Sequence, residues 1–428
     1  MGTFQVGLLL IGTFALLLAL SVPVSVSIII SSVVTMASTL SLDLGTFVAS
    51  QRMVGGVDSF SLLAVPFYIL CGVLMNTGGI AQKLIDFAKI LVGRIPGGLA
   101  HTNILGNTLF GSLSGSSVAA SVAIGGVLIP MEEKEGYDKK FAAAVNIASA
   151  PTGLIIPPSG ILIIYPVLAG CSVVGMIMSG YIPGLMWALA CMVVAYVIAK
   201  KNHYPTASVF FKYFVDAIPS LLLIVIIVGG VMSGIFTATE SAAVAVAYTL
   251  FLSIVVYRSI KIKDLPKILL DACETTAVIM FLIAGSNVMS FVISFTGLPS
   301  AIGNALISVS SNKYVILLII NLVLLVVGCF MDITPAVLIF TPIFLPVVQS
   351  FGMDPIHFGI MMVMNLGIGN ITPPVGSALF SGCSVADMDM EDMIKPILPF
   401  YAAIFVALML VAYVPWFSMA LPTLFGAV

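Results

Sequence analysis

Long apolar stretches follow one another along almost the whole chain, with short polar connections between them. Ten of them are long enough to be membrane crossings, because about 20 apolar residues in a helix span the hydrocarbon core. They cover residues 5–23, 26–48, 60–80, 141–173, 181–199, 214–236, 240–258, 271–295, 357–385 and 397–424. Apolar and polar residues do not alternate within them, which excludes a transmembrane β-barrel. The pattern predicts an all-α polytopic membrane protein.

Two further apolar regions, about 100–130 and 317–349, contain residues that favour turns (Gly, Ser, Thr or Pro) at their centres. The first carries GSLSGSSVAA at 111–120, and the second carries MDITPAVLIFTP at 331–342. Such centres interrupt a helix, and each region is too short for two comfortable crossings. Non-helical backbone at membrane depth is tolerated only where protein or a wet cavity covers it. We therefore expect two re-entrant helical hairpins.

Two of the crossings contain adjacent prolines. PTGLIIPPSG occupies 151–160 and GIGNITPPVG occupies 367–376. Proline lacks an N–H and keeps its predecessor out of the α conformation, so each segment predicts a broken helix. The freed carbonyls can bind a cation, and the N-terminus of the next half-helix can face an anion.

The two halves of the chain repeat. When residues 130–160 are compared with 346–376, a shift of 216, eight of 31 positions are identical, including both Pro-Pro pairs. Lys and Arg surround the first hairpin region but are scarce around the second, so we expect the first to open to the cytoplasm and the second to the outside. Five crossings separate them. The sequence therefore predicts an inverted-topology repeat, in which the binding site lies where the broken helices meet.

These features divide the chain into four predicted regions. They are N-terminal scaffold helices at 1–60, a first repeat at 60–200, connecting scaffold helices at 201–270, and a second repeat at 271–428.

Composition narrows the function classes. Hydrophobic residues make up 60% of the 428 residues and charged residues 8%, which excludes a soluble enzyme and a nucleic-acid-binding protein. The chain has no GxxxxGK[ST] motif, so energy for transport has to come from an ion gradient. The six cysteines form no CxxC motif and are expected to be buried apolar residues.

The polar residues at the two hairpin centres supply oxygen ligands, which hard cations prefer. The first hairpin centre offers serine hydroxyls, and the second offers Asp332 and Thr334. A carboxylate at membrane depth costs about 2.5–3.5 kcal/mol on insertion scales and needs a partner or a wet cavity. The residues 95–133, 141–199 and 314–394 contain no Lys or Arg. We therefore expect sodium ions and helix N-termini, not a fixed cation, to offset the charge of an anion.

Five segments carry a family resemblance: GSLSGSSVA at 111–119, residues 136–159, TATESAAVA at 237–245, residues 331–346 and NITPPVG at 370–376. Together they resemble the large membrane subunit, DctM type, of tripartite ATP-independent periplasmic (TRAP) transporters. Ala238 departs from the family, which often has Pro there. The resemblance implies a multi-pass protein of the bacterial inner membrane with elevator-type scaffold and transport domains. It also implies sodium-coupled import of an organic acid, such as a C4-dicarboxylate or sialic acid, without catalysis and without a cofactor other than sodium.

The resemblance implies two partners, a small four-helix membrane subunit and a periplasmic substrate-binding protein. The chain has no segment for the small subunit, so we expect a separate polypeptide. Carried over to this sequence, the sodium-binding residues are Ser114, Gly115, Ser116, Ser117, Gly153, Asp332, Thr334, Gly369 and Thr372. The expected substrate-binding residues are Ser116, Pro157, Pro158, Asn370, Pro373 and Pro374.

Other functions remain open from the sequence. A stand-alone ion-coupled anion carrier could have the same inverted repeat, and only the TATESAAVA segment and the element order argue against it. A channel would not need two duplicated helix breaks closed by hairpins. An intramembrane protease is disfavoured because the chain has no GxSG or GxGD motif.

Overall fold

The computed structural model describes residues 3–207, 212–310 and 312–427, and every regular element in these ranges is a helix. The longer helices are α1 (Thr3–Ala19), α2 (Val24–Thr39), α3 (Leu42–Val57), α4 (Ala64–Thr77), α5 (Ile80–Val92), α6 (Gly98–Ser114), α7 (Ser117–Lys134), α8 (Lys139–Ser149), α12 (Tyr181–Lys201), α13 (Lys212–Met232), α14 (Ala238–Phe251), α15 (Leu265–Phe295), α16 (Leu298–Val309), α17 (Lys313–Phe330), α18 (Ile333–Ser350), α19 (Pro355–Asn370) and α21 (Met390–Tyr413). The shorter ones are η1 (Phe60–Leu63), α9 (Thr152–Ile155), α10 (Ile161–Ala169), α11 (Val173–Ser179), η2 (Leu252–Val256), η3 (Ile262–Asp264), α20 (Ser377–Val385) and α22 (Trp416–Leu424). Residues 208–211 of the predicted region 201–270 lie outside the described residues.

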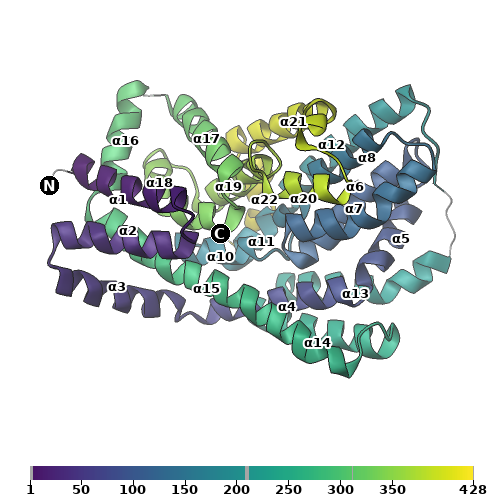
Figure 1. The fold of residues 1–428 in the computed structure, drawn as a ribbon, viewed down its shortest axis with the longest axis horizontal. Coiled ribbons are helices and arrows are strands. Elements are labelled where there is room, and N and C mark those ends of the chain that lie inside the picture. The colour runs from purple at the N-terminus through teal and green to yellow at the C-terminus, as the bar shows by residue number, and fades with distance from the viewer. Residues whose placement is uncertain (1–2, 208–211, 311, 428) are drawn as a thin grey trace.

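The helices α3, α4 and α14 form a layer along the lower side of Figure 1 together with the long helix α15, and α2 packs on α15 and α3. α15 has 31 residues and packs against α2, α3 and α4 on its way across the molecule. α14 packs against α4 and α13. We call α2, α3, α4, α14 and α15 the framework layer. It meets the remaining helices, because α15 contacts α18 and α4 contacts α6.

Seven stretches in the described part of the chain are long and apolar enough to cross a membrane. They are Phe60–Thr77, Val173–Lys201, Ala238–Val256, Ile262–Phe295, Lys313–Phe330, Ile333–Ser350 and Met390–Tyr413. The protein is therefore a multi-pass helical membrane protein by length and composition. α17 and α18 are among the seven, so apolar length alone does not separate a pair of crossings from a re-entrant hairpin.

Two predicted crossings, 26–48 and 397–424, are each divided into two helices, so their predicted bounds were wrong, although Met390–Tyr413 remains a candidate span. Within 26–48, α2 ends at Thr39 and α3 begins at Leu42, where Ser41 Oγ accepts a hydrogen bond from the Leu44 amide at 3.3 Å. This N-cap starts a new helix in a run that stays apolar. Within 397–424, α21 ends at Tyr413 and α22 begins after Pro415, which cannot donate to a continuing helix.

Two amphipathic helices were missed because they do not form continuous apolar runs. α5 buries Ile80, Leu84, Ile85 and Ala88 along one side and packs against α6 and α13. α16 follows Gly297, whose φ of +68° turns the chain out of α15. Each of these helices directly precedes one of the predicted hairpins.

Both predicted hairpin regions are helical hairpins. α6 and α7 join through Gly115 and Ser116, and α17 and α18 join through Met331 and Asp332. Figure 1 shows the first hairpin toward the right of the molecule and the second toward the left, with α19 and α20 of the second broken helix between them. Their re-entry into a membrane, and the inverted repeat, stay predictions.

Both predicted helix breaks are present. Between α8 and α10 only the four-residue helix α9 interrupts an irregular segment, and this break covers the predicted 151–160. The second break begins later than predicted, because α19 continues to Asn370 and only residues 371–376 are irregular. Pro373 restricts the residue before it but leaves positions 367–370 free to be helical.

Candidate functional site

The tip of the first hairpin is a tight turn with serines on both sides. Gly115 has a φ of +64°, which favours glycine, and Ser116 begins α7 with its Oγ accepting from the Ala119 amide at 3.2 Å. Ser114 ends α6 and Ser117 is the first residue of α7. The sequence thus folds a polar turn between two apolar helices and places three hydroxyl side chains at its end.

Each broken helix touches the hairpin of its own half through a pair of glycines. A Cβ atom on Gly153 would lie 2.2 Å from the Gly111 Cα and C atoms, and a Cβ on Gly369 would lie 2.5 Å from the same atoms of Gly328. Backbone atoms cannot move aside as a flexible side chain can. Both breaks are therefore held directly against a hairpin, a few residues from its tip.

An asparagine pair secures the same contact in each half. Asn107 Nδ2 on α6 donates to Asn146 Oδ1 on α8 at 3.0 Å. Asn365 Nδ2 on α19 donates to Asn321 Oδ1 on α17 at 2.7 Å. All four side chains are buried, where such hydrogen bonds are costly to lose. The two halves thus use the same two devices to pack a hairpin against a broken helix.

A chain of hydrogen bonds links the first hairpin tip to the second. Asn370 Nδ2 donates to Ser117 Oγ at 2.8 Å, and Ser377 is hydrogen-bonded to Asn370 Oδ1. Ser377 Oγ is also 3.3 Å from Asp332 Oδ1. Asn370 closes α19 and Ser377 opens α20, so the second break bridges the two tips.

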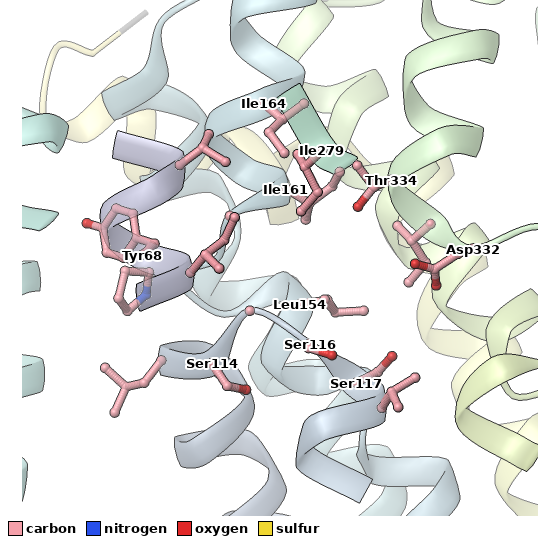
Figure 2. Close-up of a pocket in the computed structure, with 18 residues that line it drawn as sticks. Tyr68, Ser114, Ser116, Ser117, Leu154, Ile161, Ile164, Ile279, Asp332 and Thr334 are labelled. Carbon is pink, nitrogen blue, oxygen red and sulfur yellow. The ribbon is translucent and has the colours of Figure 1, made fainter. Parts of the chain in front are cut away.

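The tips face a cavity of about 110 Å³, well above the roughly 10–15 Å³ that one water requires. Figure 2 shows Ser114, Ser116 and Ser117 on one side and Asp332 and Thr334 on another. The first break contributes Leu154, Pro158, Gly160 and Ile161, and the framework layer contributes Tyr68 from α4 and Ile279 from α15. The cavity therefore lies where both hairpins, a broken helix and the framework layer meet.

Half of the predicted site residues line this cavity. They are Ser114, Gly115, Ser116, Ser117, Pro158, Asp332 and Thr334. The others are not among the residues that line it: Gly153, Pro157, Gly369, Asn370, Thr372, Pro373 and Pro374. Of these, Thr372 Oγ1 donates to the Ile368 carbonyl at 2.6 Å, and Pro374 is exposed. The second Pro-Pro pair thus lies farther from the cavity than the first.

The fixed charges of the protein around the cavity attract an anion only weakly. Three helices, α7, α10 and α18, begin at its wall, and their N-terminal amides carry partial positive charge. Among the described residues that line it, Asp332 is the one charged side chain, and it is exposed to the cavity. The Asp332 carboxylate can attract a cation, and the helix N-termini can attract an anion. A cation and an anion can therefore bind together in this cavity.

Sequence reasoning missed two residues at this site. Tyr68 lies in an apolar crossing, and its buried ring lines the cavity. In the sequence, its hydroxyl group was the feature that could have marked it as a site residue. Ser377 joins Asp332 to Asn370. It follows the second Pro-Pro pair by three residues, so its place at the start of a half-helix was the available signal.

Comparison with known proteins places this arrangement in a family. The family model described as tripartite ATP-independent periplasmic transporter, DctM component, matches residues 11–417. An uncharacterized protein, YgiK, of Salmonella typhimurium is 50% identical over 98% of both chains. The sialic acid TRAP transporter large permease protein SiaM of Vibrio cholerae is 40% identical over 96% of both chains. The C4-dicarboxylate TRAP transporter large permease protein DctM of Pseudomonas aeruginosa is 39% identical over 86% of this chain and 88% of its own.

A solved structure supports the fold. The YdaH transporter of Alcanivorax borkumensis superposes with a TM-score of 0.68 over 88% of this chain and 90% of its own, at 13% sequence identity. At that identity the likeness concerns the fold alone. The family match and the relatives confirm the resemblance found in the sequence, and they exclude an enzyme. The chain belongs to the DctM component family of tripartite ATP-independent periplasmic transporters.

Proposed function

We propose that this chain imports an organic anion across the bacterial inner membrane, driven by sodium ions, as the large subunit of a TRAP transporter. The observation that carries the proposal is the meeting of two hairpin tips at one cavity, whose described lining residues supply hydroxyl and carboxylate oxygens but include no Lys or Arg. A soluble carboxylate-binding site would normally use Arg. Here the positive charge has to arrive with the coupling ion.

Sodium has ligands of suitable chemistry at both tips. At the first tip they are the hydroxyls of Ser114, Ser116 and Ser117, with backbone oxygens near Gly115 and Gly153. At the second they are Asp332, Thr334 and Thr372, with backbone oxygens near Gly369. Hard cations prefer such oxygen ligands. The glycine contacts support this assignment, because they hold each break within a few residues of a tip.

The anion is proposed to bind between the tips, against the N-termini of the half-helices. Ser116, Pro157, Pro158, Asn370, Pro373 and Pro374 are the residues proposed to surround it. A permanent cation would hold the anion even without sodium and would weaken the coupling. Because sodium supplies the positive charge, the carrier binds the anion poorly when sodium is absent and therefore does not leak it.

The hydrogen-bonded chain from Ser117 to Asp332 gives the coupling a physical route. Asn370 contacts Ser117 at the first tip, and Ser377 contacts Asp332 at the second. A ligand that orders one tip therefore favours the bound geometry of the other. Coupling of this kind is a free energy shared between two sites and acts in both directions. We propose that the two hairpins and broken helices then move together against the framework layer, as the family resemblance implies.

The remaining parts of the proposal follow from the family. TRAP denotes a tripartite system, so we propose a small four-helix membrane subunit and a periplasmic substrate-binding protein as partners. The named relatives are assigned to sialic acid and to C4-dicarboxylates, which supports an organic acid as the substrate class. The alternative is a stand-alone carrier that needs no binding protein.

The test is uptake into proteoliposomes that contain both membrane subunits, with a panel of organic acids and candidate binding proteins. The proposal expects concentrative uptake only with an inward sodium gradient and a loaded binding protein. Proteoliposomes with the large subunit alone are the matched control. Sodium-driven uptake by that subunit alone, with no partner present, would support the stand-alone carrier instead.

A further inference from the structure

The base of the first hairpin, away from the cavity, contains a fully buried acid. Glu132 lies in the last turn of α7 and its side chain has no exposed surface, although residues 133–136 directly after it are exposed. Neither of its carboxyl oxygens forms a hydrogen bond within the described part of the chain. A buried carboxylate without a partner is strongly unfavourable, so it has to acquire a cation or a proton.

The neighbouring amide cannot neutralise this acid. Asn103 on α6 lies near the Glu132 carboxyl, but its Nδ2 forms no hydrogen bond to it. Asn103 Oδ1 accepts from Asn107 Nδ2 at 3.0 Å, and Asn107 is itself held by Asn146 and by Ser149 Oγ, at 2.9 Å. These hydrogen bonds fix the Asn103 amide, but its Nδ2 forms no hydrogen bond within the described residues. The amide is also neutral, so it does not balance a full negative charge.

Within the described ranges, no charged side chain pairs with Glu132 either. Tyr137 is close enough to influence the acid, but its hydroxyl donates to the Pro205 carbonyl at 2.8 Å. Lys140 pairs with Asp392 at 2.6 Å, and Lys139 lies 3.9 Å from Glu133. The other titratable groups on the elements packed against α7 are Lys83, Asp86 and Lys89 on α5, His101 on α6, Cys383 on α20, and Lys134, Glu135 and Asp138 beside the turn; neither Glu132 oxygen has a hydrogen-bond partner among the described residues.

We propose that Glu132 is a proton-binding site, whose carboxyl holds a proton in this arrangement and whose loss of that proton loosens the base of the first hairpin. The exposed segment 133–136 gives the proton a short route to solvent. Packing alone does not require an acid here. The residue 216 positions later, at the base of the second hairpin, is the buried Val348.

The proposal is tested on the purified full chain by infrared spectroscopy and by hydrogen exchange at several pH values. The carbonyl band of a protonated carboxylic acid is expected to disappear in Glu132→Gln and to remain in Glu133→Gln, the exposed neighbour. The protection of amides in residues 98–134, measured against the intrinsic exchange rate at each pH, is expected to fall as pH rises in the wild-type protein and to stay constant in Glu132→Gln.

An unchanged carboxylic-acid band in Glu132→Gln, or the same pH dependence of exchange in both proteins, would overturn the proposal. If Glu132→Gln does not fold, Glu132→Val, which copies the second hairpin, takes its place in both measurements. Neither readout requires transport, so these results are independent of the proposed sodium-coupled import.

Discussion

Individual glycines set how closely the broken helices approach the hairpins. Gly153 and Gly369 have no room for a methyl group, because the nearest atoms belong to the backbone of Gly111 and Gly328. By contrast, Gly126, in the same hairpin as Gly111, meets only Val385 at 3.9 Å. A side chain there would make an ordinary van der Waals contact. Gly126 is therefore a hairpin position at which a methyl group can be added without disturbing the contact between break and hairpin.

Gly153→Ala is expected to lower stability by about 1–3 kcal/mol, the usual cost of overpacking, and to abolish uptake by displacing the first break from the tip. Gly126→Ala is the matched control and should preserve both. Thermal unfolding in detergent and uptake by proteoliposomes check the two effects. Normal uptake by a well-folded Gly153→Ala protein would show that the contact between the break and the hairpin is not needed for function.

At the scale of elements, the second break connects the hairpins. The hydrogen bond from Asn370 to Ser117 is a direct contact between the end of α19 and the start of α7. Residues in one network show non-additive effects of roughly 0.5–3 kcal/mol. We expect Ser117→Ala and Asn370→Ala to be strongly non-additive in their effect on half-saturating sodium concentration.

The control cycle combines Ser117→Ala with Ser384→Ala, since Ser384 is exposed on α20 and is outside this network. That pair should be additive. Additive behaviour of Ser117→Ala and Asn370→Ala as well would mean that the hydrogen bond does not couple the two halves.

The elements that define the site were predictable from the sequence, and the ones around it less so. Gly115, Asp332 and the Pro-Pro pairs interrupt long apolar runs, so hairpins and breaks could be placed from residue type alone. The amphipathic helices α5 and α16 could not, because their polar sides end the apolar runs. Ser377 and Tyr68 were missed because their role depends on which helices become neighbours, and that information is tertiary.

At the scale of the whole molecule, the central prediction is that the two halves have opposite orientations. The distribution of Lys and Arg places 134–140 in the cytoplasm and 350–356 outside. Single cysteines at Lys134 and at the exposed Gln349 test this in a protein whose six native cysteines, including the exposed Cys273, have been replaced. Impermeant thiol reagents in intact cells should label only position 349. Labelling of both positions from one side would refute the inverted repeat.

The claim that both tips bind the coupling ion is tested most directly by the sodium dependence of uptake in Ser117→Ala and Asp332→Ala. A hydrogen bond or ligand involving a charged group contributes about 1.5–3 kcal/mol, and every 1.4 kcal/mol is about tenfold in affinity. The Asp332→Ala protein should therefore need at least roughly tenfold more sodium for half-maximal uptake, and Ser117→Ala a smaller increase. Asp43→Asn, an exposed position on α3, should behave as wild type. An unchanged sodium dependence in both tip variants, at normal expression, would show that the tips are only structural.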